Sequence, residues 1–195
     1  MKGMQFSEPM FDAVIEWRKT QTRRLVNPQP NCPYQSKDGN FYDACRGNEE
    51  DDEIKPRYKA GEIVYIKEPF VVEWYDKKNW GVWYKYTDYD AFLPTLKWTP
   101  ARHMPAKYAR HFIKITGVRC ERVQEITESD CLKEGILKVN SYSTWKLFSL
   151  PDSPNYSEFY TAQQAYAALF DQINGKGAWD SNTYVWVYDF EFVKK

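Results

Sequence analysis

The sequence lacks a charge imbalance and any long apolar run. Lys and Arg number 27 and Asp and Glu also number 27, so the chain has no net positive field of the kind that proteins use to grip long duplex nucleic acid. Any contact with nucleic acid must therefore be local, with a short strand, a loop or a single nucleoside. No stretch approaches about 18 apolar residues and the first residues form no apolar leader, so we expect neither membrane insertion nor export, and a cytoplasmic protein.

Metal ligands and phosphate loops are also scarce. The chain has 2 histidines and 4 cysteines, and no two cysteines form a CxxC pair. We expect no metal site, no cofactor and four reduced thiols. A glycine-rich phosphate loop and a strand–helix–strand rhythm are both missing, which argues against a dinucleotide-binding fold. The residues concerned are His103, His111, Cys32, Cys45, Cys120 and Cys131.

Aromatic residues are abundant instead, at 17% of the chain. Such rings favour strands and also provide stacking surfaces. Apolar and alternating runs predict strands at 3–7, 61–67, 71–75, 81–86, 112–123 and 184–193, with the second continuing into the third beyond Pro69 and a bulge at Gly117. Capping residues and helical spacing predict helices after Ser7, at 128–134 between Thr127 and Gly135, and at 160–173. The pattern predicts an α+β, mostly β fold, a mixed β-barrel with a few packed helices.

Two segments of the single domain, which spans residues 1–195, have no clear period. We interpret residues 26–60 and 138–158 as insertions, the first with at most one small hairpin around Asp38-Gly39. Added surface segments commonly carry partner contacts, so a protein partner could bind through them. The sequence gives no prediction of the oligomeric state.

The run Arg18-Lys19-Thr20-Gln21-Thr22-Arg23-Arg24, which follows a short helix, resembles the signature loop of ASCH domains. Further segments resemble the same family in the same order: 61–67, 112–136 and 186–192. The variant that carries His103-Met104-Pro105 and Ile173-Asn174-Gly175 is similar to ASCH proteins of phages and prophages. The resemblance covers the chain outside the two insertions, and it implies a PUA-like β-barrel with a cleft for RNA or a nucleoside.

One branch of that family, the small bacterial N4-acetylcytidine amidohydrolases, uses a lysine, a threonine three residues later and a distant glutamate. Lys19, Thr22 and Glu134 fall on those positions, so the resemblance implies that they are catalytic. The chemistry is consistent, because a threonine hydroxyl needs a neighbouring base and a lysine can serve where burial and nearby cations disfavour its charge. Since Lys19 and Thr22 would point to opposite faces of a continuous strand, such a site requires a turn near residues 18–20.

Six further residues are candidates for substrate binding. The arginines of 18–24 could contact phosphate, although such a run is also typical of a solvated helix end. The basic loop that begins at residue 102 could bind phosphate and stack a base, or could only pack against the barrel. A glutamate at the end of the strand 61–67 borders the cleft in the family. These candidates are Arg18, Arg23, Arg24, Glu68, Arg102 and His103.

Three functions stay open at this point. The chain could bind RNA or a modified nucleoside, it could be an amidohydrolase that acts on such a nucleoside, or it could be a phage accessory protein that acts through protein contacts without catalysis. We expect nucleoside or RNA binding, with hydrolysis of an N-acyl amide as an addition. In either of the first two cases, the side chains of Lys19 and Glu134 must meet in one cleft.

Overall fold

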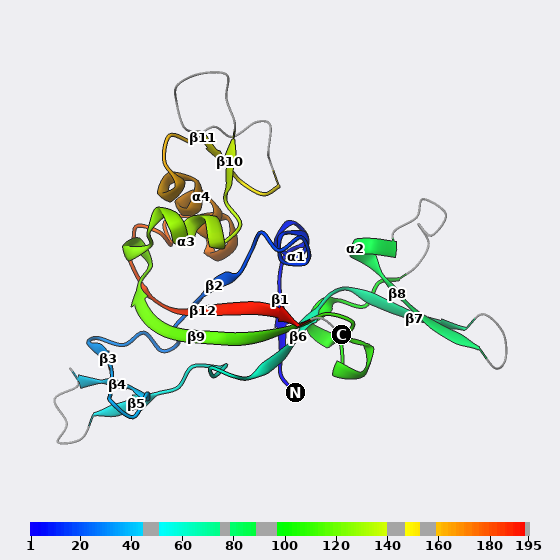
Figure 1. The fold of residues 1–195 in the computed structure, drawn as a ribbon, viewed down its shortest axis with the longest axis horizontal. Coiled ribbons are helices and arrows are strands. Elements are labelled where there is room, and N and C mark those ends of the chain that lie inside the picture. Colours follow the sequence, from blue (N-terminus) through cyan, green and yellow to red (C-terminus); the bar gives the residue numbers. More distant parts are fainter. Residues whose placement is uncertain (45–50, 75–78, 89–96, 140–146, 153–158, 194–195) are drawn as a thin grey trace.

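A computed structural model gives the arrangement of residues 1–44, 51–74, 79–88, 97–139, 147–152 and 159–193. The protein is α+β and mostly β, as the sequence predicts (Figure 1). Its centre is a five-stranded sheet with the order β1-β6-β9-β12-β2. Only β1 and β6 pair in parallel, and the other neighbours are antiparallel. These strands are β1 (Gly3–Gln5), β2 (Gln21–Leu25), β6 (Ile63–Lys67), β9 (Phe112–Arg122) and β12 (Tyr184–Val193).

In the long central pair, β12 alternates aromatic residues with valines and acidic residues, whereas β9 begins by alternating buried isoleucines with exposed polar residues. Residues 185–188 of β12 are all buried. Further along the pair, Ile115 and Ile113 of β9 lie opposite Phe190 and Phe192 and have no exposed surface. The register shifts between Asp189 and Phe190, where β9 has one additional residue beside Gly117, so the bulge predicted there is confirmed.

The sheet curls, and its two edge strands approach each other without pairing. Arg24 of β2 donates from Nη2 to the main-chain oxygen of Gln5 in β1, at 2.6 Å. The Arg24 guanidinium also lies over the Phe6 ring, 5.5 Å from its centroid. Among the described residues no backbone pairing joins β1 to β2, so the sheet is not a closed barrel. We call this gap between β1 and β2 the seam.

The described residues include four α-helices, α1 (Glu8–Ile15), α2 (Lys85–Asp88), α3 (Glu128–Lys133) and α4 (Ala162–Asn174), of which α2 lies beside β8, and 3₁₀ turns at Ala101–His103, Ala106–Tyr108 and Val123–Glu125. The predicted cap of α3 is confirmed, because the Thr127 hydroxyl oxygen accepts from the Asp130 amide at 3.1 Å. Gly135 follows with φ of 104°, the left-handed conformation that glycine tolerates best at a helix end. The helices α3 and α4 therefore begin and end within two residues of the predicted ranges 128–134 and 160–173.

The segment 26–60 is more ordered than predicted. The hairpin around Asp38-Gly39 is present, between β3 (Pro33–Gln35) and β4 (Phe41–Asp43), and β5 (Asp52–Ile54) adds a third strand. Residues 45–50 lie outside the described part. Asp38 stabilises the turn by accepting the Asn40 amide at 2.9 Å. The prediction of at most one hairpin is therefore wrong.

The second insertion and the segment after Pro69 also differ from expectation. β10 (Leu137–Val139) pairs with β11 (Leu147–Ser149), where Phe148 is 2% exposed and belongs to the core. Residues 140–146 and 153–158 lie outside the described part. β7 (Phe70–Trp74) pairs with β8 (Trp80–Tyr84) in a separate two-stranded sheet that extends away from the body, so it does not continue the central sheet (Figure 1). A proline has no amide to donate to a ladder, which explains the interruption at Pro69.

The described cysteines differ in their oxidation state. Cys120 and Cys131 are free, and burial raises the pKa of each thiol to about 12. Both thiols are thus protonated and unreactive. Cys32 is disulfide-bonded, so the expectation of four reduced thiols is wrong for that residue.

Within the described ranges, no helix has the length and apolar character needed to cross a membrane.

Candidate functional site

A tight turn after α1 brings Lys19 and Thr22 to the same cavity. The amides of Arg18 and Lys19 both donate to the main-chain oxygen of Ala13, at 2.9 and 2.8 Å, and β2 begins only at Gln21. Trp17 adopts φ of 65°, an uncommon conformation for a bulky residue, which redirects the chain. The turn required near residues 18–20 is therefore present, and Lys19 and Thr22 line one cavity.

Glu134, which directly follows α3, meets Lys19 across that cavity. Lys19 Nζ donates to Glu134 Oε2 at 2.6 Å and to the Glu134 main-chain oxygen at 2.8 Å. Arg23 Nη1 donates to the other carboxylate oxygen, Oε1, at 3.2 Å. Lys19 and Glu134 are each 3% exposed, so the pair is removed from water. The predicted meeting of these two side chains is confirmed, whereas their catalytic role stays a prediction.

Burial changes the acid–base properties of Lys19. Loss of hydration lowers its pKa below the ordinary value, and the nearby Arg24 and Arg23 act in the same direction. The Glu134 carboxylate opposes this effect through charge and hydrogen bonding, without reversing it. Lys19 can therefore lose a proton more easily than an exposed lysine, as a lysine that serves as a base must.

We call the cavity at Lys19 the inner pocket. Its volume is about 170 Å³, and its walls come from the residues after β1, from 19–25 and from α4. Besides the charged pair it contains the hydroxyl groups of Thr22 and Tyr166, and no described residue forms a hydrogen bond with either hydroxyl. The other lining residues are mostly apolar: Phe6, Ser7, Met10, Arg23, Arg24, Leu25, Leu169, Phe170, Ile173 and Asn174. The site thus combines an apolar wall with a few polar groups, as small-molecule sites do.

A second, larger cavity extends along the seam, and we call it the outer cleft. Its volume is about 670 Å³, and it shares Arg24 and Leu25 with the inner pocket. Its lining includes the cations Arg24, Lys55, Arg57, Lys67 and Arg102 and the rings of Tyr58, Trp186 and Tyr188. No Asp or Glu is among the described residues that line it. Cations interleaved with aromatic rings are the usual chemistry of a groove that binds a phosphate backbone and stacks bases.

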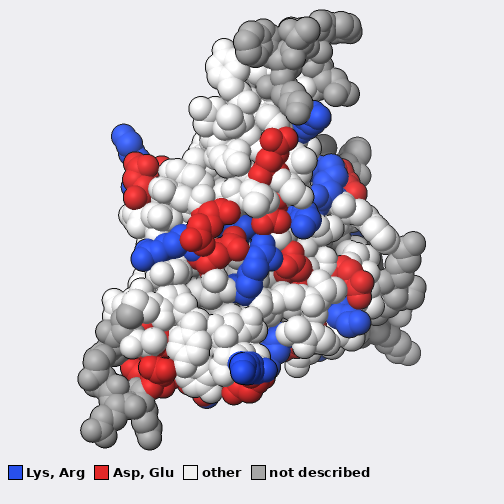
Figure 2. Space-filling view, turned by 60° about the vertical axis from the view of Figure 1, so that its left-hand side comes forward, with Lys and Arg blue, Asp and Glu red and all other residues white. Residues whose placement is uncertain are grey.

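Arg23 has a different environment from Arg24, because it points to the other face of the sheet. Its Nη2 pairs with Glu121 Oε1 at 2.6 Å and with Asp130 Oδ2 at 3.3 Å. Arg119 completes this network through Glu121, Asp130 and Asp189, at 2.7 to 2.9 Å. Figure 2 shows acidic and basic side chains interleaved on one face of the molecule. The charge of Arg23 is therefore compensated by carboxylates, and Arg23 positions Glu134 rather than offering a free cation.

Three of the predicted binding residues lie outside both cavities. Arg18 pairs with Glu16 at the end of α1. Glu68 has no exposed surface, receives two hydrogen bonds from Arg110, at 2.8 and 2.7 Å, and lines neither cavity. His103 accepts from Arg102 Nε at 2.9 Å and does not line the cleft. Of the predicted binding residues, the structure brings Arg23, Arg24 and Arg102 to the two cavities.

The sequence places Tyr166 in the helix predicted at 160–173 but does not indicate that it belongs to the site. Its position on the apolar face of α4 gives no functional signal beyond the choice of a tyrosine where a phenylalanine would pack equally well. Lys55 and Arg57 were missed because they lie in the segment 26–60, which was set aside as an insertion. Both line the outer cleft.

No metal ligand set contributes to the site. In residues that the structure describes, no group of three or more His, Cys, Asp or Glu side chains is arranged to hold a metal ion. Burial and the neighbouring Arg110 lower the pKa of His111 to about 4, so this imidazole is neutral near pH 7. His111 lies between the rings of Phe11 and Phe192, away from both cavities.

Comparison with known proteins gives no family assignment. No protein-family model matches the chain, and neither a curated protein nor a solved structure matches it.

Proposed function

We propose that the protein binds a nucleotide unit of RNA or of another modified nucleic acid, with the base in the inner pocket and the phosphates in the outer cleft. The observation that carries this proposal is the junction of the two cavities at Arg24. One cavity is small, with an apolar wall and unpartnered hydroxyls, and suits a planar ring. The other has cations and aromatic rings and suits a charged backbone.

The sizes of the two cavities support this division. Sites for drug-sized molecules have volumes of about 300–1,000 Å³. The inner pocket, at about 170 Å³, is smaller than this range and would hold a single ring system. The outer cleft, at about 670 Å³, has room for the sugar and phosphate units that a base carries. A short strand also agrees with the balanced charge of the chain, because a local patch of cations is enough for a few phosphates.

The same geometry supports a finer proposal for the fold. We assign the curled five-stranded sheet to a PUA-like barrel of the ASCH type, in the phage and prophage variant, with the seam as its ligand cleft. What supports this is the contact of Lys19 with Glu134 beside the seam, between residues that the ASCH resemblance pairs over 115 positions of sequence.

Hydrolysis of an N-acyl amide on a cytidine-like base is the second candidate function. It is favoured by the free hydroxyl of Thr22 and by the lowered pKa of Lys19 in the same pocket. Thr22 Oγ would attack the acyl carbon while Lys19 accepts the hydroxyl proton and passes it to the leaving amine nitrogen. The C–N bond breaks, and water then hydrolyses the acyl-threonine ester to release the carboxylic acid. Glu134 would orient Lys19.

The test compares binding with turnover at low salt. Wild-type protein should bind cytidine 5′-monophosphate and a short single-stranded RNA, and Trp186 in the outer cleft supplies a fluorescence signal. Thr22→Ala should keep this binding. If the protein is a hydrolase, Thr22→Ala should abolish release of acetate from N4-acetylcytidine, and adding Lys19→Ala should cause no further loss, because nucleophile and base act as a unit. Wild-type protein that neither binds nor hydrolyses these compounds would reject both functions and leave the accessory protein that acts through protein contacts.

A further inference from the structure

We infer that Tyr166 is a specificity-determining residue of the inner pocket, whose hydroxyl donates a hydrogen bond to a ring carbonyl oxygen of the bound base. The inference rests on the proposed function of that pocket and specifies the class of base that it accepts. A pyrimidine with a ring carbonyl would be bound in preference to the same ring without one.

The hydroxyl of Tyr166 differs from those of the other buried tyrosines in the described part of the chain. Tyr58 Oη donates to the Gly3 main-chain oxygen at 2.8 Å, and Tyr65 Oη donates to the Met104 main-chain oxygen at 3.0 Å. Tyr188 Oη accepts the Arg57 amide at 3.1 Å. Tyr166 is 3% exposed, and no described residue forms a hydrogen bond with its hydroxyl. The hydroxyl is not among the polar atoms that are closed off from solvent without a partner, so it opens onto the inner pocket, and its partner there must come from what the pocket holds.

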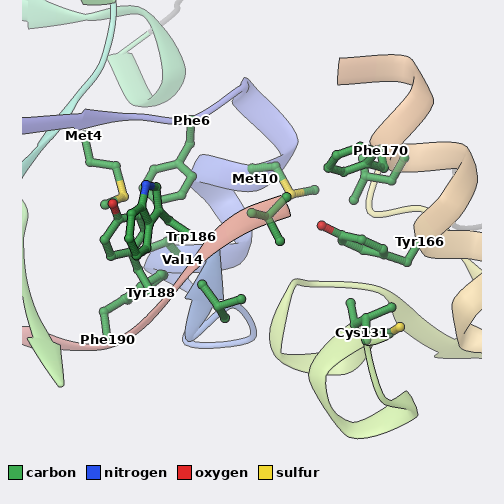
Figure 3. Close-up of a cluster of buried hydrophobic side chains, with 14 of the residues drawn as sticks. Met4, Phe6, Met10, Val14, Cys131, Tyr166, Phe170, Trp186, Tyr188 and Phe190 are labelled. Atoms are coloured by element: carbon green, nitrogen blue, oxygen red, sulfur yellow. The ribbon is translucent and has the colours of Figure 1, made fainter. Parts of the chain in front are cut away.

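The ring of Tyr166 is fixed while its hydroxyl faces the pocket. Phe170 and Trp179 lie with ring centroids 6.1 and 6.2 Å away, and the Arg23 guanidinium lies 5.8 Å from the ring. Figure 3 shows the hydroxyl directed away from α4, toward Met10. Tyr166 of α4 and Thr22 of β2 both line the inner pocket, so a bound ring would meet one hydroxyl from each element.

The free polar groups of the inner pocket are mainly donors. Burial raises the pKa of Tyr166 well above its ordinary value, so the hydroxyl keeps its proton. Lys19 uses two of its three N–H groups on Glu134, and both carboxylate oxygens of Glu134 already accept from cations. A ligand must therefore bring acceptors, and a flat ring with a carbonyl oxygen fits the apolar wall better than a hydrated anion.

The experiment compares Tyr166→Phe, which removes only the hydroxyl, with wild type on two matched probes. Cytosine carries a ring carbonyl, and 4-aminopyrimidine is the same ring without it. We expect wild type to prefer cytosine, and Tyr166→Phe to lose about five- to tenfold in cytosine affinity with no change for 4-aminopyrimidine. The melting temperature of Tyr166→Phe should be unchanged or higher, since an unpartnered buried hydroxyl is removed.

Tyr65→Phe is the matched control, because Tyr65 is buried, lines neither cavity and uses its hydroxyl on a main-chain oxygen. It should melt at a lower temperature and bind cytosine as wild type does. Three results would overturn the inference while the proposed function stands: equal affinity of wild type for both probes, unchanged cytosine affinity in Tyr166→Phe, or a loss of stability in Tyr166→Phe like that of Tyr65→Phe. Wild type that binds neither probe and no nucleotide overturns the proposed function together with the inference.

Discussion

Lys19 Nζ lies 2.6 Å from Glu134 Oε2, and this contact joins two residues that are 115 positions apart in the sequence. Both side chains are almost fully buried, so neither charge is solvated by water. The carboxylate serves two cations, because Arg23 Nη1 approaches its second oxygen at 3.2 Å. Lys19, Glu134 and Arg23 therefore form one charged group, in which the single carboxylate balances two cations.

Removing the negative charge should cost more stability than removing the lysine. Glu134→Gln leaves Lys19 buried without a counter-charge, and an unpaired buried charge destabilises a protein by about 3–5 kcal/mol. Lys19→Met should cost less, because Glu134 keeps its bond from Arg23. The measurement is the urea midpoint of each variant, with an unchanged m value as the sign of a shared unfolded state.

The double variant Lys19→Met with Glu134→Gln is the control for that asymmetry. It contains neither the Lys19 ammonium nor the Glu134 carboxylate, so no buried charge of the pair is left unpaired. Its loss in free energy of unfolding should therefore be smaller than the sum of the losses in the two single variants. Equal losses in the two single variants, added in full in the double variant, would show that the two side chains do not act on each other.

The position of Glu134 also depends on the cap of α3. Thr127→Ala removes the acceptor of the Asp130 amide at the start of the helix and should lower the free energy of unfolding by about 1 kcal/mol. Thr127→Ser keeps the oxygen and should restore most of that loss. Thermal denaturation of both variants checks the prediction, and an alanine variant as stable as wild type would contradict it.

The sequence predicts the parts of this fold that local signals determine. The alternation over 184–193, the Thr127 cap and the glycine at 135 each place an element correctly, because each depends on neighbours along the chain. The separate β7–β8 sheet and the third strand β5 depend on contacts between distant segments, for which the sequence carries no local signal. The curling of the sheet and the hydrogen bond from Arg24 to Gln5 also depend on contacts between segments that are distant in the sequence.

The candidate site likewise contains residues that the sequence indicates and residues that it does not. The Lys19, Thr22 and Glu134 set could be chosen from a motif and its order in the chain. The position of Arg18 and Glu68 outside the two cavities could not be predicted, because their ion pairs with Glu16 and Arg110 depend on the three-dimensional arrangement. Tyr166 could not be chosen, because a buried tyrosine with a partner and one without have the same sequence pattern.

Acid should weaken the network of ion pairs that Asp130 forms with Arg23 and Arg119. Although burial opposes it, the bond from Gln21 and the cations Arg119, Arg23 and Lys133 lower the pKa of Asp130 below its ordinary 3.8. A carboxylate with a lowered folded pKa stabilises the protein fully above the unfolded value, and this contribution disappears as the pH falls through the folded value.

Asp130→Asn tests that window. At pH 7 the variant should be less stable than wild type, and the difference in melting temperature should shrink below a pH of about 3.8 as wild-type Asp130 takes up its proton. Melting curves of both proteins from pH 7 to pH 2 provide the comparison. A difference that stays constant over this range would show that Asp130 contributes through its shape and not its charge.

The outer cleft should show the salt dependence of phosphate binding. Arg57 is exposed, lies over the Tyr58 ring at 5.6 Å and lines the cleft, so Arg57→Gln should weaken binding of a short single-stranded RNA with little effect on folding. If Arg57 neutralises one phosphate, the slope of log affinity against log salt should become shallower by about 0.7. Lys114→Gln is the matched control, because Lys114 is an exposed cation on β9 that lines neither cavity. Titrations of wild type and the two variants at several salt concentrations give the three slopes. An equal change in both variants would mean that the RNA responds to the overall charge of the protein, and the outer cleft would then lose its role.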